Sequence, residues 1–471
     1  MGIGQSEYGL YQIIGSLTAY INILESMLTT SILRFYCQAK ADANQTEMEN
    51  VLAIARIVYR VASFVVIIFG AVFAFVFNTM YSATMTSCEL HEGLVMLLVV
   101  SVNIIVNMTY FTYSIVVQAH ERFVFIKLLE LACLILQPVV VLLLISSMPQ
   151  ALMISIVQLI LSLITCLMKK KYATSQLGCK IVAHDVSLKT IMPIIGFSGI
   201  MLVSMIADIV FAKTGQLVSG AVLGTAAVSV YSVGYQVYQA YGVMGRMVSS
   251  VFVPHVTEIT KKIDYRSELS CLWNKTGRFS AYIVAGILLG FLLFGQEFIA
   301  IWVGEGYEES YFVALVMMLA FVPDILQALG LTYLQVLDRY NFRAFVYVAC
   351  ATGNILLSIP LTACMGVAGA AVAGLIVLSI GSGLIMNLYY GRVIGLDVSG
   401  FWRSIANALK GVPLAAVIGL CLCFAKCSSP TLTLLLHCCA FVVVYGVCIY
   451  CISMSQEEKL FVRKFVSKLI D

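Results

Sequence analysis

The chain is divided from end to end into long apolar stretches that short polar connections separate. A helix that crosses the hydrocarbon core of a bilayer needs about 20 mainly apolar residues. Charged residues make up only 11% of the chain and hydrophobic residues 61%, whereas about a quarter of a typical soluble domain is charged. The sequence therefore predicts an all-α, polytopic transmembrane helix bundle. The thirteen predicted spans are residues 10–36, 54–78, 93–117, 125–147, 150–168, 190–212, 221–250, 279–303, 311–337, 343–364, 367–390, 403–425 and 431–454.

The basic residues indicate in which direction the spans run. Of the 28 Lys and Arg residues, 25 fall on one side of the predicted bundle, in alternate connections or at the adjoining span ends. The opposite side holds only Lys213 and Lys426, and Arg246 lies within a span. Positively charged connections stay in the cytoplasm, so we expect the C-terminal tail inside and the N-terminus outside. An outside start without a signal peptide, together with the odd number of spans, predicts one further span upstream of Met1.

A faint internal repeat favours a two-lobed arrangement. Residues 8–34 align with residues 228–254 at an offset of 220, and both predicted spans run from outside to inside, six spans apart. Parallel duplication of six spans is a common plan of transporters. We therefore expect a transmembrane lobe in 1–189 that lacks its first helix, a pseudo-symmetric lobe in 190–400, and two additional spans with a cytoplasmic tail in 401–471.

Three of the carboxylates inside predicted spans are candidate functional residues: Glu25, Asp208 and Asp324. An ionisable group in hydrocarbon costs at least about 2.5–3.5 kcal/mol near a helix centre, so such groups usually face a cavity or an ionic partner. For Glu25 and Asp208 a functional and a structural role both stay open. Asp324 follows Pro323, and a proline kinks a helix because it frees a backbone carbonyl. An acid beside a kink suits a gate or a coupling site, with a structural role as the alternative.

Two arginines lie near the cytoplasmic ends of the first two predicted spans. Arg34 closes the first span, and Arg60 lies one turn after Arg56 on the second. They are candidates for a basic vestibule that attracts an anionic substrate. The alternative is that they anchor the spans by reaching out to the membrane interface with their charged ends.

The predicted span 221–250 carries the richest set of polar groups at membrane depth. Three tyrosines recur at i, i+4 and i+7 and therefore share one helix face, and an amide and a guanidinium follow them. Lipid-facing helices avoid such groups, so we interpret this face as the lining of a cavity, with packing between helices as the alternative. Aromatic rings and amides suit sugar rings, and a guanidinium suits phosphate. These residues are Tyr231, Tyr235, Tyr238, Gln239 and Arg246.

The sequence lacks the motifs that would indicate a catalytic or motor protein. It contains neither a GxxxxGK[ST] phosphate loop, which a built-in ATPase needs, nor an HExxH zinc motif. Cys448 and Cys451 form a CxxC pair on an apolar stretch without a neighbouring His or Asp. The net charge of +4 is modest, and its basic residues follow the topology, so we expect no nucleic-acid partner. The sequence thus favours a secondary transporter or flippase over an enzyme, with no metal and no resident cofactor.

Several motifs together resemble one family of transporters. A YGLY motif precedes a long span that ends in an Arg-Phe pair, and LGTAAVSVYSVGYQVYQ is followed shortly by SSVFVPHVTEI. In combination these features resemble the Wzx-type polysaccharide flippases of the multidrug/oligosaccharidyl-lipid/polysaccharide (MOP) exporter superfamily, over essentially the whole chain. The matching positions are Tyr8-Gly9-Leu10-Tyr11, Arg34-Phe35, Asp208, Gly224, Tyr231 and Pro254.

The resemblance implies a MATE-like bundle of two six-helix lobes with a central cavity and alternating access. It implies export of an undecaprenyl-diphosphate-linked oligosaccharide across a bacterial inner (plasma) membrane for surface polysaccharide biosynthesis. The implied partners are membrane lipid and the polyprenyl-diphosphate-linked oligosaccharide, and contact with polysaccharide polymerase machinery stays open. The family usually has a helix before the YGLY motif, and this sequence departs from the family in lacking it.

On this interpretation, the cations Arg34, Arg60 and Arg246 hold the diphosphate and the tyrosine face contacts the sugars. A cation-coupled multidrug exporter of the same superfamily is the alternative. It would use proton or sodium coupling and depend on the carboxylates of Glu25, Asp208 and Asp324. A membrane-embedded polysaccharide polymerase or glycosyltransferase is disfavoured because no large outer loop carries paired acids, and a non-transporting scaffold is disfavoured by the buried polar groups.

Overall fold

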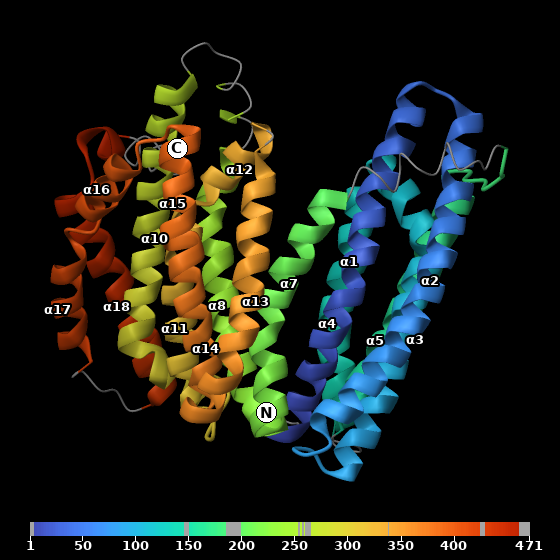
Figure 1. Ribbon diagram of the computed structural model, residues 1–471, viewed down its shortest axis with the longest axis horizontal. Helices are drawn as coiled ribbons and strands as arrows, with labels where there is room; N and C mark the ends of the chain where they lie inside the picture. Colours follow the sequence, from blue (N-terminus) through green and yellow to red (C-terminus); the bar gives the residue numbers. More distant parts are fainter. Residues whose placement is uncertain are drawn as a thin grey trace. The chain divides into compact units, whose positions relative to one another are not determined.

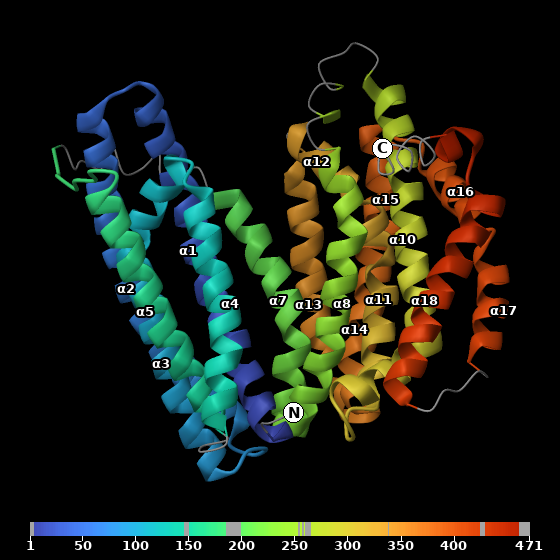
Figure 2. The ribbon, with the colours of Figure 1, turned by 180° about the vertical axis from the view of Figure 1, so that it is seen from behind.

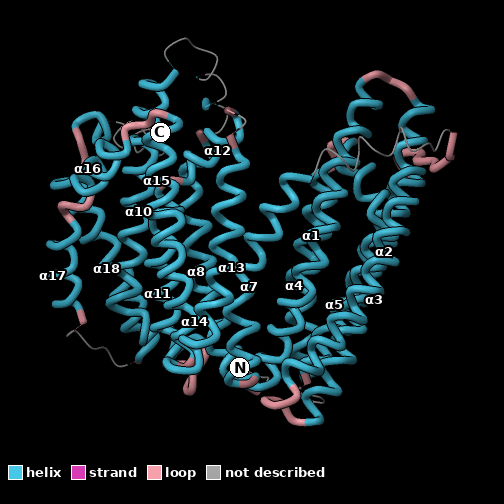
Figure 3. Tube along the Cα trace, in the orientation of Figure 1, coloured by secondary structure: helices cyan, strands magenta, loops and turns pink. Residues whose placement is uncertain are grey.

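The computed structural model describes residues 4–145, 150–184, 199–252, 255–256, 259, 265–337, 339–423 and 429–460 (Figure 1). These residues form helices and loops, and none of them lies in a strand (Figure 3). The prediction of an all-α protein is therefore confirmed. The chain divides into two compact units, Met1–Ser229 and Val230–Asp471, which we call the N-terminal unit and the C-terminal unit and describe separately.

The N-terminal unit consists of long helices whose ends are fixed by local sequence. The Asn44 side chain accepts a hydrogen bond from the Glu47 backbone N–H at 3.1 Å and so caps the second helix. Thr86 and Glu89 form a reciprocal capping box at the start of the third, which satisfies two otherwise unpaired backbone groups. The helices are α1 (Gln5–Ala41), α2 (Gln45–Tyr81), α3 (Ser87–Ala119), α4 (Phe123–Ile145), α5 (Ala151–Ser175), α7 (Gly199–Leu223) and the beginning of α8 (Thr225–Val251).

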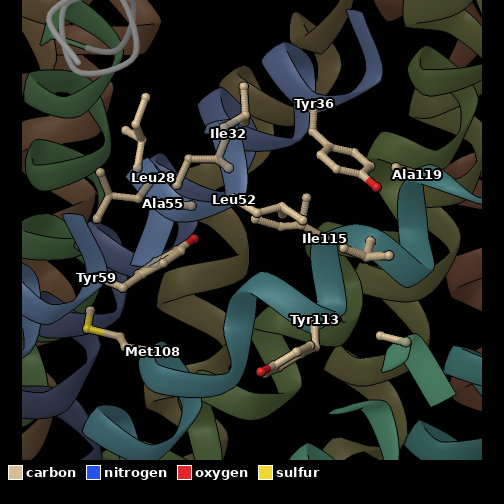
Figure 4. Close-up of a cluster of buried hydrophobic side chains, with 14 of the residues drawn as sticks. Leu28, Ile32, Tyr36, Leu52, Ala55, Tyr59, Met108, Tyr113, Ile115 and Ala119 are labelled. Carbon is tan, nitrogen blue, oxygen red and sulfur yellow. The ribbon is translucent and has the colours of Figure 1, made fainter. Parts of the chain in front are cut away.

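A buried apolar cluster joins α1, α2 and α3 (Figure 4). Ile32 from α1, Tyr59 from α2 and Ile115 from α3 are almost completely inaccessible within it. Other side chains of α2 are apolar and yet exposed, such as Phe64 at 64% and Phe75 at 72%. Apolar residues on both the packed and the outer face of a helix are typical of a bundle whose solvent is lipid.

The described part of the C-terminal unit contains the remainder of α8 and twelve further helical elements, seen from the other side in Figure 2. From Val367 to Ile394 one continuous span alternates between α-helical and wider π-helical turns. The elements are α10 (Tyr265–Trp302), α11 (Glu309–Leu326), α12 (Ala328–Val336), α13 (Tyr340–Met365), α14 (Val367–Leu378), α15 (Met386–Tyr389), α16 (Val398–Ala408), α17 (Val412–Leu422) and α18 (Pro430–Cys448), with π-helical turns η1 (Ser379–Ile385), η2 (Tyr390–Ile394) and η3 (Ile449–Ser453).

Eleven helical segments of the described chain are long and apolar enough to cross a membrane. The helices α1 and α8 cover two further predicted spans, 10–36 and 221–250. The protein is therefore a multi-pass membrane protein, as predicted. The predicted lobe boundary at residue 189 stays a prediction; α7 packs against α1, and the compact N-terminal unit extends to Ser229.

Two predicted element boundaries were wrong. The polar stretch before residue 279 was expected to be a connection, but α10 already begins at Tyr265, because charged residues do not prevent a helix from extending beyond the membrane. The predicted span 311–337 is two helices, α11 and α12, that meet at Gln327. The predicted span 403–425 corresponds to one candidate membrane span, Val398–Leu422, in which a turn separates α16 from α17.

Candidate functional site

Close packing between α8 and α11 forms the framework of the candidate site. A Cβ atom added at Gly234 would lie 2.8 Å from Val313 Cγ1, and one added at Gly245 would lie 2.5 Å from Ile325 Cγ2. The Ser310 hydroxyl also donates to the Val230 carbonyl at 2.7 Å. Since Gly234 and Gly245 are eleven residues apart, or three helical turns, they place one face of α8 directly against α11.

The same face of α8 carries Tyr238 and Arg246. Tyr238 stacks on Phe321 of α11 with ring centroids 4.2 Å apart. Gly242 lies between them, and a Cβ there would come within 3.1 Å of Arg246 Nη1. A glycine at this position therefore leaves room for the guanidinium to fold back along α8.

Arg246 forms an ion pair with Asp324 in the last turn of α11. The Nη2–Oδ2 distance is 3.0 Å, and the side chains are 41% and 20% exposed. Asp324 follows Pro323 and precedes the break between α11 and α12 at Gln327, so the predicted acid beside a proline is found at a helix end. An ion pair of this kind offsets part of the cost of placing charges at membrane depth.

A third helix, α13, completes the cluster. The Tyr347 hydroxyl donates to the other carboxylate oxygen, Oδ1 of Asp324. The Arg343 guanidinium lies over the Tyr347 ring, 3.9 Å from its centroid, and donates to the Tyr340 hydroxyl at 3.0 Å. Arg246, Asp324, Tyr347 and Arg343 thus form a connected chain across α8, α11 and α13. Two guanidiniums and one carboxylate leave this chain with one net positive charge.

The remaining predicted residues of α8 lie close to this cluster in sequence. Tyr231 and Tyr235 are buried, at 4% and 7% exposure. The exposed Gln239 donates its amide N–H to the Tyr235 hydroxyl at 2.6 Å. The role of this face in contacting sugars stays a prediction.

Four further predicted residues belong to the N-terminal unit. Arg34 of α1, Arg60 of α2 and Asp208 of α7 are exposed. The Glu25 side chain lies outside the described residues. Their roles stay predictions. Of the predicted residues, Arg246 is hydrogen-bonded to Asp324 and Gln239 to Tyr235.

Sequence reasoning missed Arg343 and Tyr347. Arg343 was counted only as a basic residue near the start of a span, yet it is 8% exposed. Tyr340, Arg343 and Tyr347 recur at i, i+3 and i+7, the spacing of one helix face. That pattern could have identified them. Among the described residues, His, Cys, Asp and Glu side chains do not gather into a group of three that could hold a metal ion.

The sequence matches a known family over most of its length. A family model described as "Polysaccharide biosynthesis protein" matches residues 3–312. The chain belongs to this polysaccharide biosynthesis protein family. No curated protein sequence matches the chain.

Two solved structures share the fold of this polysaccharide biosynthesis protein. "Lipid II flippase MurJ, inward closed conformation" has 14% sequence identity and a TM-score of 0.65, with 98% of each chain covered. "Inward-facing conformation of a multidrug resistance MATE family transporter of the MOP superfamily" has 10% identity and a TM-score of 0.67, covering 85% of this chain and 96% of that chain. The prediction of a MATE-like helical fold is therefore confirmed.

Proposed function

We propose that this protein is a flippase that carries an undecaprenyl-diphosphate-linked oligosaccharide across the bacterial inner membrane for surface polysaccharide biosynthesis. The observation that carries the proposal is the guanidinium of Arg246, partly exposed within a cluster of net positive charge. A guanidinium binds phosphate through two parallel hydrogen bonds. The family match supports the polysaccharide substrate, and the shared fold with a lipid II flippase supports the transport step.

The proposed roles of the other residues follow from their chemistry. Arg34 and Arg60 attract an anionic headgroup at the cytoplasmic ends of α1 and α2, and Tyr231, Tyr235, Tyr238 and Gln239 offer rings and an amide to the sugars. Alternating access moves the headgroup from the inner to the outer leaflet. We place the C-terminus in the cytoplasm and the N-terminus, as numbered, outside. The product would then be passed to polysaccharide polymerase machinery.

An apolar groove in the C-terminal unit suits the prenyl tail of such a substrate. Aliphatic and aromatic side chains of α10 and α18 line it, including Phe291, Phe298 and Phe441. Gly286 and Gly290 of α10 also line it, and their lack of side chains lets Tyr445 and Phe441 of α18 pack closely against α10. A prenyl chain gains about 0.8 kcal/mol for each CH₂ that it buries. The tail would therefore stay in apolar surroundings while the headgroup crosses.

The test is complementation of a polysaccharide-producing bacterium that lacks its own flippase. Arg246→Ala should reduce surface polysaccharide by about tenfold or more, because a hydrogen bond to a charged group contributes about 1.5–3 kcal/mol. Arg246→Lys, which keeps the charge but loses the planar fork, should be intermediate. Arg339→Ala removes an exposed arginine beside α13 and serves as the control. Normal polysaccharide with Arg246→Ala would count against the proposal.

A cation-coupled multidrug exporter is the second candidate, because the fold is also that of a MATE transporter. In this candidate Asp208 and Asp324 bind the cation or the drug. The pairing of Asp324 with Arg246 and Tyr347 argues against it, since both carboxylate oxygens already accept hydrogen bonds. A drug-resistance phenotype without any polysaccharide defect would favour the exporter and contradict the flippase.

A further inference from the structure

We propose that the start of α4 and the end of α5 together form a binding site for one anionic phospholipid of the cytoplasmic leaflet. Lys127 and Lys171 hold the phosphate of its headgroup, and exposed apolar faces of the two helices carry its acyl chains. Both helices belong to the N-terminal unit, and the inference does not depend on the proposed transport function.

Two side-chain contacts fix how α4 and α5 lie against each other. The rings of Phe125 and Tyr172 stack with their centroids 4.2 Å apart. Farther along α4, the Sγ atom of Cys133 lies 3.1 Å from Oγ1 of Thr165. A step forward along α4 therefore corresponds to a step back along α5, so the two helices are antiparallel and their register is defined.

This register brings lysines of the two helices to the same level. Lys127 comes two residues after Phe125, and Lys170 comes two residues before Tyr172. Since every residue of an α-helix rises by about 1.5 Å, the stacked rings place Lys127 level with Lys170 and Lys171. The sequence alone does not reveal this proximity, because the lysines lie on different helices.

The cluster carries a net positive charge. Lys127 pairs with Glu130 at 2.7 Å, but both side chains are exposed, and an exposed ion pair is weak. The Lys170 ammonium lies over the Tyr110 ring of α3, 5.8 Å from its centroid, and Lys171 is exposed. Three ammonium groups and one carboxylate thus attract an anion to this end of the helix pair.

Exposed apolar side chains continue from the two lysines toward the middle of the membrane. On α4 they follow Lys127 at i+4 and i+7, and on α5 they precede Lys171 by the same intervals, so each set shares a helix face with its lysine. They are Leu131 and Leu134 of α4 and Ile164 and Leu167 of α5. A surface that is apolar along the spans and cationic at their ends complements a phospholipid, which joins acyl chains to a phosphate, better than it complements a free anion.

The charge of the cluster selects among phospholipids. Lys and Arg residues next to a membrane span attract anionic lipids of the cytoplasmic leaflet, and the sequence places this end of both helices in the cytoplasm. Phosphatidylglycerol carries one negative charge. Phosphatidylcholine has the same phosphate but also a choline cation, which the lysines repel. The site should therefore prefer phosphatidylglycerol.

The experiment measures lipid binding to the purified full-length protein by native mass spectrometry. The probes are dioleoylphosphatidylglycerol and dioleoylphosphatidylcholine, which differ only in the headgroup. Wild type should bind the first phosphatidylglycerol about tenfold or more tightly than the first phosphatidylcholine, since each lysine beside an anionic headgroup contributes about fivefold. Lys127→Gln combined with Lys171→Gln should remove most of this preference. Lys127→Arg combined with Lys171→Arg should keep it, because both charges remain.

Lys275→Gln combined with Lys410→Gln is the matched control. It removes two exposed lysines from the C-terminal unit on the side predicted to be cytoplasmic, and its lipid preference should equal that of wild type. An equal loss of preference in the control would show an effect of overall charge and overturn the site. An unchanged preference in Lys127→Gln/Lys171→Gln would also overturn it. Displacement of the bound lipid by millimolar inorganic phosphate would show that the lysines take a free anion, which overturns the lipid assignment.

Discussion

Arg278 of α10 makes a two-point ion pair with Glu458, just beyond η3. Its Nε lies 2.7 Å from Oε1 and its Nη2 lies 2.9 Å from Oε2 of the carboxylate. Nη2 also donates to the Tyr282 hydroxyl at 2.9 Å and to the Ser453 carbonyl at 3.1 Å. One side chain thus holds the segment after α18 against α10.

Arg278→Ala should lower the free energy of unfolding by about 3 kcal/mol, because breaking a buried pair leaves the other charge uncompensated. The side chains of Arg278 and Glu458 are only 16% and 6% exposed. Lys127→Ala is the control, since the Lys127–Glu130 pair is 73% and 53% exposed and should contribute less than about 1 kcal/mol. Thermal unfolding in detergent measures the loss of stability in both variants. Equal losses would show that the Arg278–Glu458 pair contributes no more to stability than the exposed Lys127–Glu130 pair.

The same pair predicts a pH dependence. Burial opposes ionisation of Glu458, but hydrogen bonds from Arg278 and the Ser455 backbone N–H outweigh it and hold the pKa of Glu458 below its ordinary value. A carboxyl of this kind stabilises the folded protein above its unfolded pKa of about 4.3, and that contribution is lost as the pH falls through its folded pKa.

The melting temperature of wild type should therefore exceed that of Glu458→Gln near neutral pH. The difference between the two proteins should shrink when the pH is lowered below about 4, where the carboxyl becomes protonated. Melting curves recorded from pH 3 to pH 7 measure this difference. A difference in melting temperature between the two proteins that stays constant from pH 3 to pH 7 would show that Glu458 is not the source of the pH dependence.

The sequence predicted two residues of the candidate site, Arg246 and Asp324. Each was identified by itself, because an ionisable group inside an apolar stretch is unusual. Their pairing was not predicted, since it depends on Gly234 and Gly245 bringing α8 against α11, and spacing within one helix does not reveal its neighbour. Arg343 was missed because its position near a helix start resembles an ordinary anchor.

At the scale of the elements, spans were predicted well and their ends poorly. Hydrophobic length determines where a helix can cross the bilayer, so each predicted span coincides with helix in the described chain. Hydrophobicity does not determine where a helix stops in water or within the bundle, and so the early start of α10 and the break at Gln327 were not predicted.

The apolar groove between α10 and α18 can be tested by filling it. Cys438 is exposed on α18 and lines the groove, so Cys438→Trp should exclude a prenyl tail and reduce surface polysaccharide by about tenfold, with little loss of melting temperature. Cys439→Trp places the same ring at the neighbouring exposed position, which is not among the groove-lining residues. Equal losses of surface polysaccharide in the two variants would show that filling the groove is not the cause of the loss.

At the scale of the whole molecule, the charge distribution predicts an orientation in the membrane. Cys88, Cys37 and Cys451 are exposed side chains near the ends of predicted spans. The predicted topology puts Cys88 outside and the other two at the cytoplasmic face. In single-cysteine variants of the chain, a membrane-impermeant maleimide should label Cys88 in intact cells and the other two only after permeabilisation. Labelling of Cys37 or Cys451 in intact cells would reverse the orientation.

The π-helical turns in the span Val367–Ile394 have a consequence for how the protein can change over evolution. Each such turn accommodates one residue more than an α-helical turn, and two of them, η1 and η2, occur within these 28 residues. Deletion of a single residue from η1 could restore a regular α-helix there and leave the flanking segments facing their original neighbours. One residue can therefore be lost from this span without loss of the contacts at its two ends. Gly369 would still face Leu361 at one end, and Tyr390 would still face Trp273 at the other.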